Sequence, residues 1–185
     1  MRLFVSVDLP NAFAEPLSAI QSAFEDARGL TFTDPTQAHL TLKFLGDVDP
    51  SRLPQLETEL ERAVADADVD PFPVEFAGLG VFPSLSYVRV LWLGTERGTA
   101  ELTRLYESIE AWTTAIGFEP DDHEFTPHVT LARMSHAGGK ALVQRLVRER
   151  EPTLGTTTVE AVHLTESTLT PDGPVYETVT VFPLE

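Results

Sequence analysis

The sequence predicts an α+β, bilobal fold in which two pseudo-symmetric antiparallel sheets line a central cleft and helices pack outside. Two observations predict it. Helix-like and strand-like segments follow in a similar order in both halves of the 185-residue chain, which indicates a loose internal duplication. Each half also carries the pattern His, apolar, Thr, Leu in a strand-like run, at His39–Leu42 and at His128–Leu131. No linker separates the halves, so we expect one domain over residues 1–185.

The elements of the first half follow from hydrophobic periodicity. Strands are predicted where apolar residues alternate, helices where they recur every three or four residues, and ends where Gly and Pro cluster. The predicted order is a strand over 2–8, a helix carrying Phe13 to Phe24, an extended segment from Phe32 to Pro35, a strand over 38–45, a helix carrying Leu53 to Val64 behind a Ser51 cap, and a hairpin of strands 74–81 and 87–93.

The second half repeats the helix and His-strand pattern. The turn Pro171-Asp172-Gly173 separates its last two strands, because proline presets φ and glycine accepts positive φ. The predicted order is a helix carrying Leu102 to Ile116, a strand over 128–134, a helix carrying Leu142 to Val147, one long strand over 156–169 and a final strand over 175–184.

Composition narrows the functional classes. The chain has no cysteine, which excludes disulfides and thiol chemistry, and no apolar run long enough to span a membrane. Asp and Glu number 29 against 13 Lys and Arg, for a net charge of −16. The electrostatic field of this negative charge repels nucleic-acid backbones unless salt screens it. Because the acidic residues are spread along the chain, we interpret them as an adaptation to high salt. The alternative is a protein that does not bind nucleic acids. We expect a cytoplasmic location.

The doubled motif predicts acid–base chemistry. In a strand, residues i and i+2 share a face, so His39 and Thr41 point one way, as do His128 and Thr130. Near neutrality, one imidazole can be neutral and the other charged, so one ring can take a proton while the other gives one. Threonine hydroxyls can hold a phosphate between the rings. The scheme uses no metal and no other cofactor.

Two other interpretations compete with catalysis. A lone strand histidine is more often structural, and we interpret His123, His136 and His163 in that way or as exposed. The doubling in equivalent places is what favours a catalytic role for the motif pair. A metal site is the other interpretation, but zinc needs three or four ligands, and neither His strand offers a carboxylate at i+2 or i+4.

The motifs resemble the two-histidine phosphoesterase superfamily, most of all its RNA 2′,3′-cyclic phosphodiesterase branch, also called 2′-5′ RNA ligase-like. The resemblance covers nearly the whole chain. It rests on the opening strand Arg2–Pro10, the first signature His39–Gly46, the hairpin segments Gly78–Pro83 and Val88–Trp92, the second signature Pro127–Arg133, and the closing-hairpin residues Ser167, Leu169, Gly173 and Tyr176.

The resemblance implies hydrolysis of a 2′,3′-cyclic phosphate at an RNA end to a 2′-phosphate. Carried over, His39 protonates the departing 3′ oxygen and His128 activates water. Thr41 and Thr130 hold the phosphate, and the phosphate-contacting arginine of the family corresponds to Arg133. Strict alternation places Arg133 on the face away from His128, so that contact needs a strand end or a twist.

The sequence also predicts roles or positions for three further residues. Alternation places Lys43 on the face of His39, where it could bind substrate through its charge or be a solvated strand-end residue. Phe4 could stack on a base, but a core position is favoured. Phe32 stands where the branch commonly has tryptophan, which keeps aromatic packing and removes the indole N–H.

The predicted partners are RNA 3′ ends or short nucleotides bearing a cyclic phosphate, with no membrane, and the protein is expected to be a monomer. Three alternatives remain open: a phosphodiesterase for small cyclic nucleotides, 2′-5′ ligation by the reverse reaction, and a non-catalytic module that binds RNA ends or nucleotides. A metallo-hydrolase would require that EDTA abolish activity.

Overall fold

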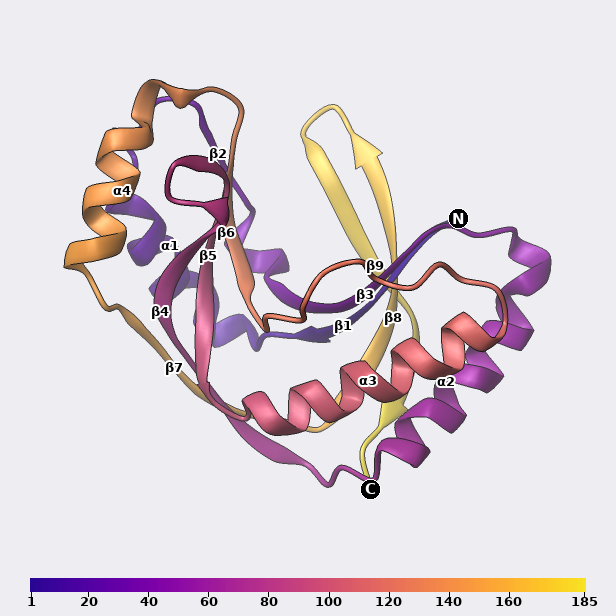
Figure 1. Ribbon diagram of the computed structural model, residues 1–185. Coiled ribbons are helices and arrows are strands. Elements are labelled where there is room, and N and C mark those ends of the chain that lie inside the picture. Colours follow the sequence, from indigo (N-terminus) through magenta and orange to yellow (C-terminus); the bar gives the residue numbers. More distant parts are fainter.

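The computed structural model describes all 185 residues and confirms the α+β, bilobal fold (Figure 1). Its nine strands are β1 Arg2–Asp8, β2 Leu30–Phe32, β3 His39–Asp47, β4 Phe72–Ser84, β5 Tyr87–Arg97, β6 Val129–Met134, β7 Thr153–Val159, β8 Ala161–Thr170 and β9 Gly173–Pro183. The four α-helices are α1 Ala14–Ser22, α2 Leu53–Ala67, α3 Thr99–Ala115 and α4 Lys140–Glu149.

The strands form one antiparallel sheet in the order β7-β4-β5-β6-β3-β1-β8-β9, with β2 paired to β6. One lobe holds β3, β1, β8 and β9, and the other holds β6, β5, β4 and β7. Between β3 and β6 the register contains a single residue pair, Leu40 with Val129, which we call the seam pair. The two predicted sheets therefore meet as one sheet at the seam, because the two His strands are neighbours.

Helices cover the outer faces of the curled sheet (Figure 1). Helices α2 and α3 pack on each other beside β3 and β9, and α1 contacts β7 on the other lobe. A cluster of 36 buried apolar residues fills the space between sheet and helices. No helix combines the length and the apolar character that crossing a membrane requires.

Two local predictions are wrong. Ser51 does not cap α2: it lies in a 3₁₀ turn that is capped by Asp49, whose carboxylate accepts from the Ser51 N–H at 2.9 Å. The single strand predicted over 156–169 is two strands, β7 and β8, separated at Glu160. They pair with β4 and with β1, in different lobes, so the chain must change direction between them.

Both His strands contain a β-bulge directly after the motif threonine. In β3, Thr41 pairs with Ser6 and Lys43 with Val5, so one residue has no partner across the strand. In β6, Thr130 pairs with Trp92 and Ala132 pairs with Leu91, so one residue of β6 again has no partner. A bulge of this kind reverses the alternation of side chains beyond it.

Candidate active site

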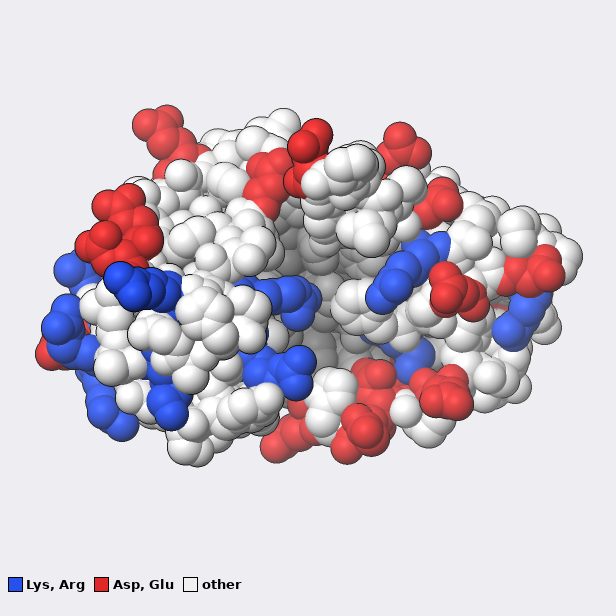
Figure 2. All heavy atoms as spheres, turned by 90° about the horizontal axis from the view of Figure 1, so that it is seen from above, with Lys and Arg blue, Asp and Glu red and all other residues white.

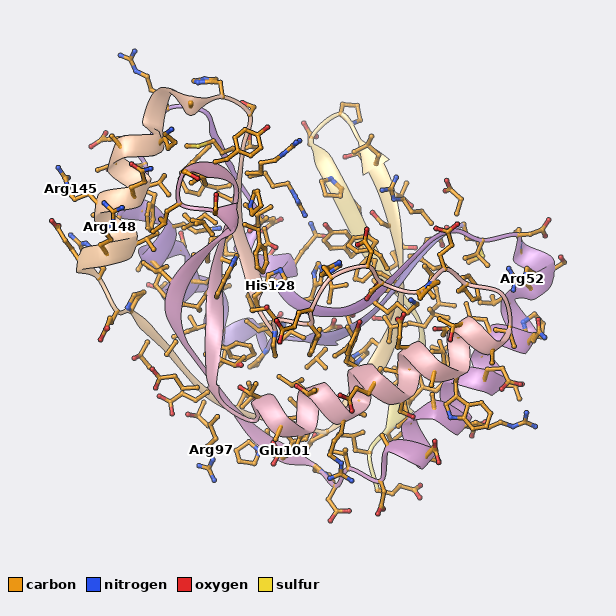
Figure 3. All side chains as sticks on the ribbon, viewed as in Figure 1. Arg52, Arg97, Glu101, His128, Arg145 and Arg148 are labelled. Carbon is orange, nitrogen blue, oxygen red and sulfur yellow. The ribbon has the colours of Figure 1, made fainter.

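The seam brings the two motifs together in the cleft. The seam pair is antiparallel and buried, so its neighbours His39 and Thr41 lie beside Thr130 and His128 respectively, on the opposite face. Figure 2 shows this face hollowed between the two halves, and Figure 3 places His128 between the lobes. Each histidine is thus next to the threonine of the other motif, around a space between four polar side chains.

A backbone carbonyl orients each of the two imidazoles. His39 Nδ1 lies 3.1 Å from the carbonyl oxygen of Gln37, and His128 Nδ1 lies 2.7 Å from that of Thr126. A carbonyl only accepts, so each ring carries its proton on Nδ1 when neutral. Nε2 of each ring is then the atom that can take or give a proton. The partner is two residues upstream in both motifs.

The charged surroundings of the two rings differ. Burial lowers the pKa of both histidines below the ordinary 6.5. For His39, the Asp8 carboxylate on the neighbouring strand opposes this and raises the pKa, while Arg133 lowers it. For His128, the charges of Arg133 and of His39 both lower the pKa further. The arrangement suits His39 to hold a proton and His128 to be neutral.

Aromatic rings support His39. Its ring lies 4.8 Å from Phe4 and 4.9 Å from Tyr176, centre to centre. Phe4 is buried at 2% exposure, but it lies outside the core cluster and packs on the cleft side against His39 and Tyr176. Phe44, which the bulge turns toward the cleft, lies 5.7 Å from Phe4 and is half exposed.

His128 has an equivalent aromatic support from the β4–β5 hairpin. Its ring lies 4.9 Å from Phe82 and 5.8 Å from Trp92. A Cβ at Gly80 would come within 2.2 Å of the Trp92 ring, so only glycine lets the indole lie across β4. These contacts restrict the imidazole to one orientation.

Arg133 lies on the cleft side of β6, contrary to strict alternation. The bulge leaves Leu131 and Ala132 both buried and makes Arg133 the next exposed residue. Its charge lowers the pKa of both histidines, which places the guanidinium near both. Arg145 and Arg148, in contrast, are directed outward from α4, away from the cleft (Figure 3).

Lys43 does not share a face with His39, and this prediction is wrong. The bulge in β3 turns its side chain to α3, where it is 1% exposed. Its Nζ donates to Glu110 at 2.6 Å and to the carbonyl of Glu119 at 2.9 Å. A lysine so enclosed cannot contact a ligand in the cleft.

The other histidines lie outside the motif pair. His123 is exposed beside Asp122, and His136 accepts from the backbone N–H of Gly138. His163 Nδ1 lies 3.8 Å from Asp8 Oδ2 and is buried. Across the chain, no three His, Asp or Glu side chains are grouped to share a metal ion.

Sequence reasoning missed two residues that act on His39. Asp8 ends the first strand on the same face as Ser6, and it pairs with His39 across β1 and β3. Gln37 supplies its backbone carbonyl to the His39 ring, and its side chain holds β9 through the carbonyl of Pro174 and the N–H of Tyr176. The alternation of β1 indicated the face of Asp8, but the pairing of strands was needed to identify its neighbour.

A bilobal sheet with one His-x-Thr motif from each lobe at the seam defines the class of two-histidine phosphoesterases. The chain belongs to the 2′-5′ RNA ligase superfamily, whose family model matches residues 9–170. The family predicted from the motifs is thereby confirmed.

Relatives of similar length agree with this membership. The chain is 32% identical to the RNA 2′,3′-cyclic phosphodiesterase of Methanothermobacter thermautotrophicus, over 100% of this chain and 99% of the relative. It is 33% identical to that of Archaeoglobus fulgidus, over 98% and 99%. The crystal structure of the Thermus thermophilus protein TT0787 superposes with a TM-score of 0.81 at 31% identity, covering 100% of this chain and 98% of that chain.

Proposed function

We propose that this protein hydrolyses the 2′,3′-cyclic phosphate at RNA 3′ ends to a 2′-phosphate, without a metal ion. The observation that carries the proposal is the seam: two imidazoles, each with Nδ1 held by a carbonyl two residues upstream, flank one space with two threonine hydroxyls. The names of the archaeal relatives support the substrate class.

The proposed reaction is an in-line displacement at phosphorus. His128 Nε2 takes a proton from water, whose oxygen forms the new bond to phosphorus. The bond from phosphorus to O3′ breaks, and His39 Nε2 gives its proton to the departing oxygen. The product carries a 2′-phosphate and a free 3′-hydroxyl, and the two histidines have exchanged protonation states. Each proton transfer contributes about 10²–10⁴-fold to such rates.

The remaining polar groups stabilise charge on the phosphoryl oxygens. Thr41 and Thr130 donate hydroxyl hydrogens from opposite sides of the seam, and Arg133 adds a positive charge. The difference in charged neighbours supports the assignment of roles, since Asp8 favours a protonated His39 and no carboxylate raises the pKa of His128.

The testing experiment is turnover of a short RNA that ends in a 2′,3′-cyclic phosphate, in the presence of EDTA, with separation of the two isomeric phosphomonoesters. We expect only the 2′-phosphate. His39→Ala and His128→Ala should each lower kcat by about 10²–10⁴-fold while binding survives. His136→Ala, on a loop outside the cleft, is the matched control and should retain full turnover.

The other outcomes separate the alternatives. A 3′-phosphate product would overturn the orientation of the substrate. Loss of activity with EDTA and its return with a divalent metal would overturn metal independence. Binding without turnover would favour the non-catalytic module, and turnover of mononucleotides alone would favour a small cyclic nucleotide as substrate. The cytoplasmic location and the monomeric state stay predictions.

A further inference from the structure

The loop of residues 119–127 connects α3 to the second His motif. Figure 1 shows the chain running from the far end of α3 back to β6 in the other lobe. The loop lies outside every helix and strand, and none of its residues takes part in a backbone–backbone hydrogen bond. Its conformation therefore depends on contacts made by side chains.

The first group of contacts lies at the start of the loop. Lys43 Nζ donates to the carbonyl oxygen of Glu119 at 2.9 Å and to the Glu110 carboxylate of α3 at 2.6 Å. The other oxygen of that carboxylate accepts from the N–H of Asp121 at 2.7 Å. Lys43 is buried, so water competes little for these bonds. They hold the start of the loop against α3 and β3.

The second contact lies near the end of the loop. The Phe125 ring stacks on the Tyr106 ring of α3, with the ring centres 4.3 Å apart and the planes inclined by 6°. Tyr106 and Glu110 stand at positions i and i+4 of the helix, so their side chains share one face. That single face of α3 thus holds both ends of the loop.

The residue after Phe125 orients the imidazole of His128. The carbonyl oxygen of Thr126 lies 2.7 Å from His128 Nδ1, and Thr126 makes no other hydrogen bond. In the first motif the corresponding residue, Gln37, is fixed by its own side chain, which bonds to β9. Thr126 has no such bond, so the direction of its carbonyl depends on the residues beside it.

We propose that α3 positions His128 through this loop, and that Phe125 is the positioning residue because its stack on Tyr106 fixes the carbonyl of the adjacent Thr126. The inference rests on the proposed function, since it takes His128 as the group that accepts the proton of water. Without the stack the carbonyl turns away from the ring, and neutral His128 can carry its proton on Nε2. In that tautomer Nε2 has no lone pair for the proton of water.

The first test reads the tautomer of His128 in the absence of substrate. Nitrogen-15 NMR spectra of the labelled protein are recorded at about pH 8, where His128 is neutral because burial lowers its pKa below 6.5. The signals of His128 are those missing from His128→Ala. We expect the Nδ1–H form in the unmodified protein and a mixture of both forms in Phe125→Ala, with the His39 signals unchanged. A pure Nδ1–H form in Phe125→Ala would overturn the inference.

The second test measures kcat and KM on RNA that ends in a 2′,3′-cyclic phosphate. Phe125→Ala should lower kcat by roughly 10- to 100-fold and change KM by less than about threefold, because a misplaced base slows the reaction more than it weakens binding. Tyr106→Leu removes the other ring of the stack and should give the same loss. Tyr106→Phe keeps the ring and should retain kcat. An equal loss in Tyr106→Phe would overturn the role of the stack.

Phe118→Ala is the matched control. Phe118 is also partly buried against the core, but it precedes the contacts of Lys43 and packs on the Arg52 guanidinium, 4.6 Å from the ring centre. Its removal tests for a general loss of stability, and it should leave both the tautomer and kcat unchanged. Equal losses in Phe118→Ala and Phe125→Ala would overturn the assignment to Phe125. Absence of turnover by the unmodified protein would instead overturn the proposed function, and the tautomer would still decide whether the loop positions the ring.

Discussion

Two histidines of the same motif are made chemically different by their charged neighbours. Burial lowers the pKa of both rings; the Asp8 carboxylate across from His39 opposes this effect, whereas the charges near His128 lower the pKa of that ring further. Both rings have the same kind of Nδ1 partner, a backbone carbonyl two residues upstream, and similar aromatic contacts, so the Asp8 carboxylate is the main asymmetry between them. Paired titrating groups with opposed environments are the usual basis for separate acid and base roles.

The pH dependence follows from these neighbours. Burial places both pKa values below 6.5, so the rate should be bell-shaped with its maximum on the acid side of that value. Asp8→Asn removes the group that favours protonated His39, so His39 loses its proton at lower pH and the alkaline limb moves to lower pH. Profiles of kcat/KM for both proteins test this. A flat profile, or an alkaline limb that moves upward, would contradict it.

The threonines should contribute to the rate separately from the histidines. Thr41→Val and Thr130→Val each remove one hydroxyl donor and keep the shape of the side chain. We expect each to lower kcat/KM by about tenfold, the effect of one hydrogen bond to a charged oxygen. Thr58→Val, on the exposed face of α2, is the control. Full activity in either cleft variant would remove that threonine from the phosphate site.

At the scale of elements, the bulge in β3 directs nearby side chains to different sides of the strand. Thr41 stays in the cleft, while Lys43 turns to α3 and joins three segments of the chain. Its ammonium contacts Glu110 of α3 and the carbonyl of Glu119, and Glu110 also accepts from the N–H of Asp121. The loop held in this way leads to His128. These contacts thus connect β3, the first His strand, to the loop that precedes the second His strand, β6.

Breaking this buried pair should cost stability. Lys43→Met leaves the Glu110 carboxylate without its cation, and we expect about 3 kcal/mol less free energy of unfolding in urea. The double variant Lys43→Met/Glu110→Met should recover part of the loss, because the carboxylate in closest contact with the lysine is removed with it, while Asp121, 3.7 Å from Lys43 Nζ, keeps its charge. Arg62→Met, in the exposed pair with Glu59, is the control, with a change below about 1 kcal/mol. A similar small change at Lys43 would contradict the assigned role.

Over the whole molecule, negative charge dominates the surface. Figure 2 shows Asp and Glu on both halves around the hollow, with more of the Lys and Arg on one half. Residues 129–150 carry five Lys or Arg and one Glu, in a chain whose net charge is −16. Repulsion among the acidic groups opposes the compact state and weakens as salt shortens its range.

Salt should therefore stabilise the protein. We expect the thermal unfolding midpoint to rise steadily as KCl increases into the molar range. Substitution of several exposed acidic residues, such as Glu61, Glu96 and Glu107, by glutamine should reduce that dependence. A midpoint that is highest in dilute buffer and declines with KCl would show that the acidic surface is not an adaptation to salt.

The sequence by itself determined the family, the motif residues and most elements. Alternation and helical spacing depend on neighbours in the chain, so β1, β3 and the four helices are found close to their predicted positions. His39, Thr41, His128 and Thr130 are brought together because each motif lies on its own strand and both strands meet at the seam. Local pattern was sufficient where local geometry decides the direction of a side chain.

Only the tertiary structure decided what depends on pairing between distant strands. A bulge exists relative to a partner strand, so alternation alone misplaced Lys43 and did not account for Arg133. The division of residues 153–170 into two strands reflects partners in different lobes. The proximity of Asp8 to His39 comes from the register of β1 against β3. These contacts join residues far apart in the chain, and no periodicity along the sequence encodes their register.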